Sequence, residues 1–235
     1  LTTDDLVALN ADTVAGLKTA AIQALTTSQV SQLSATQIKA LTTDQLNAME
    51  QADVEKLTTS QVAALKADQV GALSTTQLGR LSTAQVSALS GAPISRLSTD
   101  SVKSLSSAQV AAINVTALRS LTADQINALD TADLAGMGTA QVASLRADQL
   151  QGMTTSQLNV LTTGQVTALS DAQLGSLTTT QVATLKTDAI ATLNSEQITG
   201  LKVEQLAALS TAQISKISAN AIAGLSGGQI GSLST

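Results

Sequence analysis

Large aliphatic residues recur along the chain at two positions of an eight-residue period. Counting by eights from Leu1 through Leu9 to Leu233, every first position is Leu, Ile or Met, every sixth is Val, Ile or Leu, and nothing interrupts the count. The 235 residues are 29 complete octads and three further residues, with the consensus Leu-(Ser/Thr)-Thr-x-Gln-(Val/Ile/Leu)-x-Ala. A fixed short period predicts a repeat protein whose core is shared between neighbouring repeats.

The polar positions of the octad predict where each helix begins. The second position is Ser or Thr in 19 of 30 octads, and the fifth is Gln in 19 of 29. Ser/Thr-x-x-Gln is a capping box, in which the hydroxyl accepts from the backbone N–H three residues on, and the Gln side chain accepts from the backbone N–H of the cap. Representative pairs are Thr26 with Gln29, Thr42 with Gln45, and Thr58 with Gln61.

The aliphatic positions fit the same frame. The first position precedes the cap and the sixth lies in the helix, which is the spacing of a hydrophobic staple, and the next first position follows three residues later on the same helical face. One octad is then a helix of roughly 9 Å followed by a bend. The predicted core ladder includes Leu25, Val30, Leu33, Ile38, Leu41, Leu57, Val62 and Leu65.

Continuous regular structures do not fit this period. In an unbroken α-helix the Leu stripe would rotate by roughly 80° per octad, and in a strand positions one and six would point to opposite sides. A β-solenoid with a corner in each octad remains the alternative, although the usual Gly, Asn and Asp turn residues are lacking. We expect an all-α solenoid, a superhelix of very short helices with one helix per octad.

We expect residues 1–235 to form a single uninterrupted array, as a segment of a longer protein. Pro93 stands at the fifth position, in the first helical turn, where a missing N–H costs least. Asp100, Asp124 and Asp148 are spaced by 24 residues, which indicates three octads per superhelical turn. The first three octads lack the Gln, and the last two are rich in Gly.

Composition restricts the chemistry. The chain has no Cys, His or aromatic residue, and its 12 basic and 17 acidic residues are scattered. These features disfavour disulfides, thiolate metal sites, nucleophilic catalysis with a His base and a nucleic-acid surface. We expect no enzyme activity, no cofactor or metal, no nucleic-acid partner and no membrane insertion in this segment. Basic residues replace the cap four times with an acid two positions on, which predicts surface ion pairs at Lys66, Arg146, Lys186 and Lys202.

One repeated polar position is not explained by capping. The third position is Thr in 16 of 30 octads, although the box does not use it. An array of hydroxyls is typical of a surface that binds ice or a polysaccharide, carries O-linked sugars, or contacts another copy of the array. The binding hypothesis requires the third positions to lie exposed on one face.

The consensus, seen in residues 57–64 (LTTSQVAA) and 177–184 (LTTTQVAT), resembles octapeptide arrays of very large repetitive bacterial proteins of the surface, adhesin-like or secreted kind. The resemblance covers essentially the whole chain and implies an extracellular or cell-surface structural role. We therefore expect an elongated rod, stalk or filament whose partners are neighbouring repeats or further copies, and glycan as a possible ligand. The alternative is a module that binds ice or polysaccharide through its Thr and Ser hydroxyls.

Overall fold

The structure is a computed structural model that describes residues 2–233, and these residues form short α-helices and no strand. The chain divides into two compact units, one ending at Leu121 and the other beginning at Thr122, which are described separately. The predicted all-α solenoid is confirmed, and the β-solenoid is excluded for the described residues.

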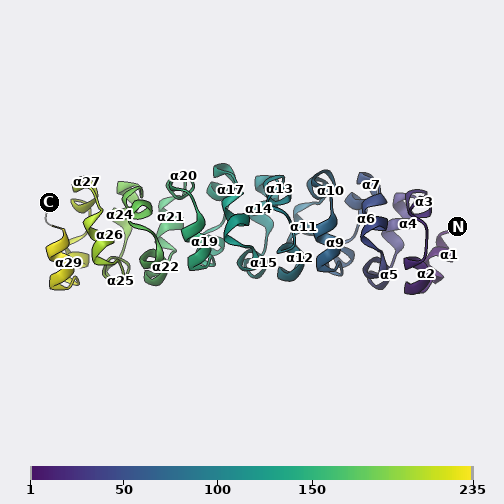
Figure 1. Cartoon of the computed structure of the whole chain (residues 1–235), viewed down its shortest axis with the longest axis horizontal. Coiled ribbons are helices and arrows are strands. Elements are labelled where there is room, and N and C mark those ends of the chain that lie inside the picture. Colours follow the sequence, from purple (N-terminus) through teal and green to yellow (C-terminus); the bar gives the residue numbers. More distant parts are fainter. Residues whose placement is uncertain (1, 234–235) are drawn as a thin grey trace. The chain divides into compact units, whose positions relative to one another are not determined.

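The first unit contains fifteen helices in its described residues (Figure 1), which are α1 (Thr3–Ala8), α2 (Ala11–Ala15), α3 (Thr19–Gln23), α4 (Thr27–Gln32), α5 (Ala35–Ala40), α6 (Thr43–Ala48), α7 (Gln51–Lys56), α8 (Thr59–Ala63), α9 (Ala67–Ala72), α10 (Thr75–Arg80), α11 (Thr83–Ser87), α12 (Gly91–Ile94), α13 (Thr99–Lys103), α14 (Ser107–Ala112) and α15 (Val115–Ser120). The described part of the second unit continues with α16 (Ala123–Asn127), α17 (Thr131–Gly136), α18 (Thr139–Ala143), α19 (Ala147–Gly152), α20 (Thr155–Asn159), α21 (Thr163–Thr167), α22 (Asp171–Ser176), α23 (Thr179–Ala183), α24 (Thr187–Thr192), α25 (Ser195–Thr199), α26 (Val203–Ala207), α27 (Thr211–Ile214), α28 (Ala219–Ala223) and α29 (Gly227–Ser232). Each octad thus contributes one helix that begins at its third position.

Local chemistry explains why every octad starts a new helix. At α8 the N-cap residue Thr58 is extended, with φ −72° and ψ 159°, and its carbonyl accepts the first helical bond from Val62 N at 3.0 Å. The helix ends at Ala63 with Ala64 as its C-cap, and Leu65 N still donates to Val62 O at 3.2 Å. No described residue has a positive φ, so the bends between helices use ordinary extended backbone.

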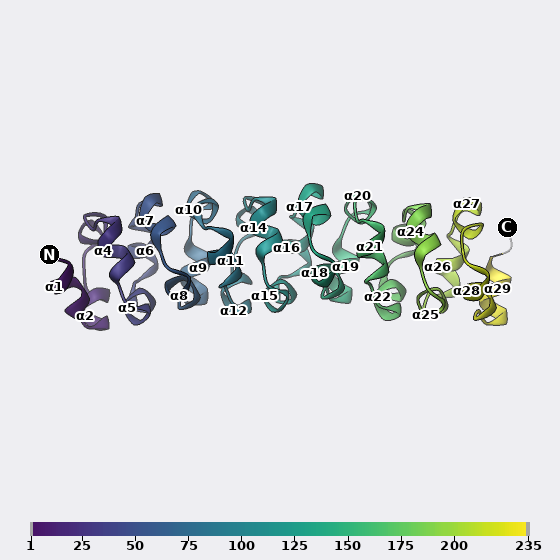
Figure 2. The ribbon, with the colours of Figure 1, turned by 180° about the vertical axis from the view of Figure 1, so that it is seen from behind.

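Each unit is a coil in which helices three apart in the sequence pack together. Such pairs include α2 with α5 and α9 with α12 in the first unit, and α16 with α19 and α22 with α25 in the second. Figure 2 shows the same winding from behind, with consecutive helices turning about the unit's long direction. Helices that share a side of the coil therefore come from octads far apart in the sequence.

The core of each unit consists of the first and sixth positions. Of the predicted core residues, Val30, Leu33, Ile38, Leu41, Leu57, Val62 and Leu65 are at most 4% exposed. Leu25 is only half-buried, as are Leu9 and Leu17 in the same first turn. First-position side chains are buried from Leu33 to Leu225, because from Leu33 onward another turn of the coil precedes them and packs against them.

Candidate functional site

The feature that repeats most regularly is a buried Gln that makes three hydrogen bonds. In Gln69, which is 1% exposed, Oε1 accepts from the backbone N–H of Lys66 at 2.7 Å. Its Nε2 donates to Ile38 O at 2.9 Å and to Leu41 O at 2.8 Å, 31 and 28 residues earlier in the chain. The amide therefore caps its own helix and also ties it to the previous turn of the coil.

The structure places the three predicted Thr–Gln pairs in this geometry. Thr26 N donates to Gln29 Oε1 at 2.9 Å, Thr42 N to Gln45 Oε1 at 2.8 Å, and Thr58 N to Gln61 Oε1 at 2.6 Å. The reciprocal bonds from the Gln backbone N–H to the Thr hydroxyl measure 3.3, 3.1 and 3.2 Å.

The second function of the Gln escaped the sequence analysis, which treated it only as a cap. Gln45 Nε2 donates to Val14 O at 2.9 Å and Leu17 O at 2.7 Å, and Gln61 repeats this with Val30 O at 2.9 Å and Leu33 O at 2.7 Å. One signal was present in the sequence, since no octad has Glu at the fifth position. Glu completes a capping box as well as Gln does, but an ionised carboxylate has no N–H to donate.

These bonds also correct the length of one superhelical turn. The 24-residue interval between Asp100 and Asp124 indicated three octads per turn. The Gln amides instead reach carbonyls 28 and 31 residues earlier, while helices pack against the third helix before them. Each helix therefore packs against the helix three octads earlier, and its Gln amide bonds to the helix four octads earlier. One turn of the coil takes between three and four octads.

Several octads lack the Gln, and one of them has a substitute. Pro93 and Ser101 occupy the fifth position in α12 and α13, and Ser101 Oγ accepts from its own cap Ser98 Oγ at 2.9 Å. In α15 the fifth residue is Ala117, and the cap Asn114 takes over. Its Oδ1 accepts from Ala117 N at 2.9 Å while its Nδ2 donates to Leu89 O at 2.9 Å and Ser87 O at 3.1 Å.

Two octads bury an Asp where the Gln would stand. Asp53 is 3% exposed and Asp133 is 2% exposed. Asp53 Oδ2 accepts from Glu50 N at 3.3 Å, but a carboxylate cannot donate to the preceding turn. Burial raises the pKa of Asp53; the bond from the Glu50 backbone opposes this shift, and the neighbouring Glu50 charge adds to it. This octad therefore keeps the cap at the cost of a desolvated charge.

Among the four ion pairs predicted beside basic caps, the described residues form one. Arg146 Nη2 lies 2.7 Å from Asp148 Oδ2, and Arg146 Nε donates to Asp148 Oδ1 at 2.9 Å. This bidentate contact lowers the pKa of Asp148, chiefly through the hydrogen bonds from Arg146. In the described chain, the exposed residues Lys66, Lys186 and Lys202 form no such pair.

The Thr residues at the third position stand outside this network. Fifteen of them begin a helix in the described chain, and each is exposed or half-buried. Hydroxyls at the second position accept from the helix, as at Thr58, and several at the seventh or eighth position donate to a preceding carbonyl, as Ser144 Oγ does to Gln141 O at 2.7 Å. The hydroxyls of these fifteen Thr residues make no hydrogen bond within the described residues, whereas Ser195 Oγ, at the same position of its octad, donates to Asn220 O at 3.4 Å.

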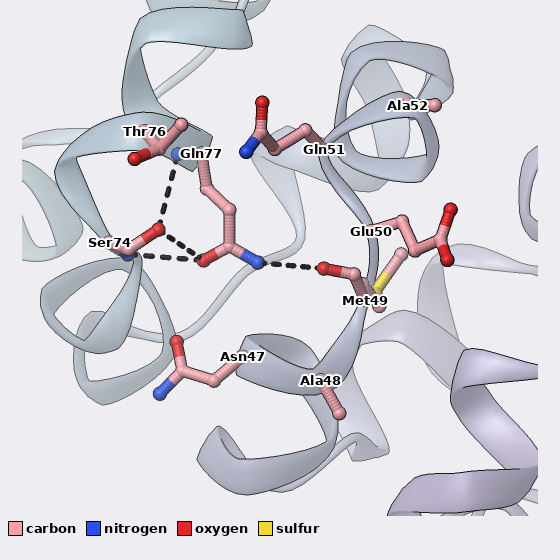
Figure 3. Close-up of a pocket in the computed structure, with 9 residues that line it drawn as sticks. All are labelled: Asn47, Ala48, Met49, Glu50, Gln51, Ala52, Ser74, Thr76 and Gln77. Carbon is pink, nitrogen blue, oxygen red and sulfur yellow. Dashed lines mark hydrogen bonds between the residues drawn. The ribbon is translucent and has the colours of Figure 1, made fainter.

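A polar pocket lies in the first unit between the α6–α7 junction and the start of α10 (Figure 3). Figure 3 shows Gln77 at its centre, bonded to Ser74 and to the carbonyl of Met49. Ser74 N donates to Gln77 Oε1 at 3.1 Å, and Gln77 Nε2 donates to Met49 O at 3.1 Å. The amides of Asn47 and Gln51 lie on either side, so this pocket offers hydrogen-bond donors and acceptors.

Among residues 2–233, no group of three or more Asp, Glu, His or Cys side chains is arranged to hold a metal ion. Nor does any helix in this range combine the length and apolar character needed to cross a bilayer.

Comparison with known proteins identifies the repeat. The family model of the ALTTAQ repeat matches residues 1–35, 46–83, 126–171 and 203–235, which together make up more than half of the chain. No curated protein matches the sequence. The matched segments contain the capping pairs Thr26–Gln29 and Thr58–Gln61 together with aliphatic positions that build the coil, and the chain belongs to the ALTTAQ repeat family.

Proposed function

We propose that this chain is a structural repeat protein that forms an elongated rod or stalk at the bacterial cell surface. The observation that carries the proposal is the Gln bond between successive turns. Gln77 in α10 and Gln165 in α21 make the same contacts to carbonyls 28 and 31 residues earlier, in separate units. A contact that repeats with a fixed register lets a coil grow in one dimension, as in other solenoids.

The composition supports a mechanical function over a catalytic one. Without His or Cys, the Ser and Thr hydroxyls have no usual base or thiolate partner, and most second-position hydroxyls are already engaged in capping. The polar groups that are regular in this chain stabilise the coil itself. We therefore propose that the protein is not an enzyme and needs no cofactor.

The extracellular location and the partners are part of the same proposal. The likeness of the octads to arrays in large repetitive bacterial surface proteins supports them. The expected partners are neighbouring repeats and further copies of the array, which offer a self-similar surface.

Small-angle X-ray scattering tests the shape directly. A globular chain of 235 residues has a radius of gyration of about 18 Å, and a rod must exceed this value clearly and give a linear cross-section Guinier region. A radius near the globular value would refute the rod. Protease accessibility of the protein on intact bacterial cells, compared with lysed cells, tests the location independently of the shape.

A further inference from the structure

Charged residues are absent from one side of the coil in the first unit. Of its fifteen complete octads, eleven carry at least one Asp, Glu, Lys or Arg. The four octads that carry none are residues 25–32, 57–64, 81–88 and 105–112, which contain the helices α4, α8, α11 and α14. Apart from their aliphatic core positions, these octads consist of Ala, Ser, Thr and Gln.

These four helices follow one another from turn to turn. Helix α8 packs on α11, and α11 packs on α14. Gln61 of α8 donates to Val30 O of α4 at 2.9 Å, which links α4 to the same series. In Figure 1, α4, α11 and α14 follow the middle of the unit, between the edge with α10 and α13 and the edge with α12 and α15. We call α4, α8, α11 and α14 together the uncharged side. No other series linked in this way is free of charge, because every other octad of the unit has a charged residue.

Burial within the coil does not explain this lack of charge. The fourth-position residues of the four octads are all exposed, and they are Ser28, Ser60, Ala84 and Ala108. The coil accepts a charge at this position, because Asp44, Asp68 and Asp100 occupy it in other octads of the unit. An acid there favours the first turn of a helix through the helix dipole. The uncharged side therefore lacks charges that the fold itself would tolerate.

The composition of the uncharged side is suited to burial against another protein. Small side chains such as Ala and Ser lose little rotamer freedom when they are buried, in contrast to Lys, Arg or Glu. Several hydroxyls already have partners, since Ser82 Oγ accepts from Gln85 N at 3.2 Å and Ser87 Oγ donates to Ala84 O at 2.9 Å. These bonds lower the cost of removing the hydroxyls from water. Twenty-two residues of the four octads are exposed or half-buried, and a standard interface uses about 20–30 residues per partner.

A second copy of the chain fits the uncharged side better than an unrelated polymer. A contact along this side must match the spacing of successive coil turns, and another coil has the same spacing because it has the same fold. In a two-fold contact each side chain meets the same surface of the partner, so a charged row would oppose like charges. The chain carries a net charge of −5, which makes copies repel each other. The uncharged side avoids this opposition of like charges.

The Thr residues at the third position do not single out a ligand-binding face. They begin α10 and α13 on one edge of the first unit as well as α8 and α11 on the uncharged side. The hypothesis of a hydroxyl face for ice or a polysaccharide requires these residues on one face. They therefore give no reason to prefer either ligand as the occupant of the uncharged side.

We propose that two copies of the chain pair side by side through their uncharged sides. The contact buries Ala, Ser and Thr side chains, and charged residues of the flanking helices, such as Arg80 and Arg96, surround it. Such a rim is typical of protein interfaces, whose centres are depleted of charged residues. This inference rests on the proposed association between copies of the array, and it depends on neither the rod shape nor the cell-surface location.

Acidic substitutions at fourth positions of the full chain test the proposal. The test variant carries three exposed substitutions on the uncharged side, which are Ser60→Asp, Ala84→Asp and Ala108→Asp. The matched control carries three exposed substitutions on α3, α10 and α12, which are Ala20→Asp, Thr76→Asp and Ala92→Asp. Both variants change the net charge equally and at the same position of the octad. Sedimentation velocity over a range of protein concentrations measures association, and circular dichroism verifies that each variant is folded.

We expect the wild type to associate reversibly as its concentration rises. The test variant should raise the dissociation constant by about tenfold or more, since like charges then oppose each other across the contact, while the control stays within about threefold. A third variant with Lys at the same three positions of the uncharged side should bind the acidic test variant more tightly than either binds itself. High salt should leave the wild-type association intact, because no ion pair holds the centre of the contact.

A wild type that stays monomeric up to near-millimolar concentration overturns the proposal, as does an equal loss of association in the two folded acidic variants. Dissociation of the wild type at high salt would also overturn it, because the contact would then depend on charged residues. X-ray scattering from the monomeric test variant still reports the shape of a single chain. The rod can therefore hold or fail independently of the pairing.

Discussion

Gln61 Nε2 donates to the carbonyl oxygen of Leu33, which lies 28 residues earlier in the chain, at a distance of 2.7 Å. The same nitrogen donates to Val30 O at 2.9 Å, while Gln61 Oε1 accepts from the cap Thr58 N at 2.6 Å. One side chain thus satisfies a helix N-terminus and two carbonyls of the turn before it. Suitable substitutions can therefore remove the N–H donors of this side chain while keeping its oxygen acceptor.

Replacing Gln61 with Glu should destabilise the first unit more than replacing it with Ala. The introduced carboxyl keeps the cap but sets a buried charge against two carbonyl oxygens, which should cost roughly 3–5 kcal/mol at pH 7, whereas Ala should cost about 1–3 kcal/mol. Urea unfolding followed by circular dichroism gives both values. Because burial raises the folded-state pKa of the introduced carboxyl, the penalty should shrink as the pH falls toward its ordinary value of about 4.3. Equal losses at pH 7 would argue against the donor function.

The substitution Asp53→Gln should stabilise the protein. It removes a buried carboxylate and supplies an amide that can reach the carbonyls of Ile22 and Leu25, 31 and 28 residues earlier, for a gain of about 1–2 kcal/mol at pH 7. The pKa of Asp53 is raised in the folded state, so its stability contribution is complete below the ordinary value of 3.8 and is lost as the pH rises through the folded-state pKa. The gain should therefore be largest at neutral pH and fade below pH 3.8. If the gain in stability does not change with pH, the buried carboxylate of Asp53 is not its cause.

Asn114→Asp should destabilise the protein although it keeps the cap. The carboxylate can still accept from Ala117 N, but it cannot donate to Leu89 O, so we expect a loss of about 1 kcal/mol. Asn194→Asp is the matched control, because Asn194 caps Gln197 N at 2.9 Å and leaves the contact with the previous turn to Gln197 itself. Thermal melts compare the stability losses of the two variants. Similar shifts of the melting temperature in both would show that capping is the only function of Asn114.

Inserting one Ala after Gln109 should lower the melting temperature far more than Gln109→Ala. The substitution removes the bonds from Nε2 to Leu78 O and Leu81 O at 2.8 Å each, and the bonds that Oε1 accepts from Ser106 N at 2.9 Å and Ser106 Oγ at 3.2 Å. The insertion shifts every later first and sixth position against the preceding turn, and a register shared along the coil cannot absorb the extra residue. Comparable melting temperatures would refute the shared register.

Much of the fold follows from the sequence alone, because the signals are local. A hydroxyl and a Gln three residues apart determine where each helix starts, and the aliphatic residues at the first and sixth positions determine which side of it is buried. These interactions act within one octad, so the helix of one octad, the bend and the core residues could be predicted for a repeat such as residues 57–64 without knowledge of its neighbours. Pro93 likewise fits its helix for a local reason, since the first helical turn needs no N–H there.

The tertiary structure decided what happens between octads. The angle between consecutive helices determines how many octads complete a turn, and no residue within a single octad specifies that angle. Only the winding brings Gln61 beside Leu33 and buries Leu33 more fully than Leu25. A turn of between three and four octads brings together residues 28 and 31 positions apart, so these contacts become visible only once the coil is known.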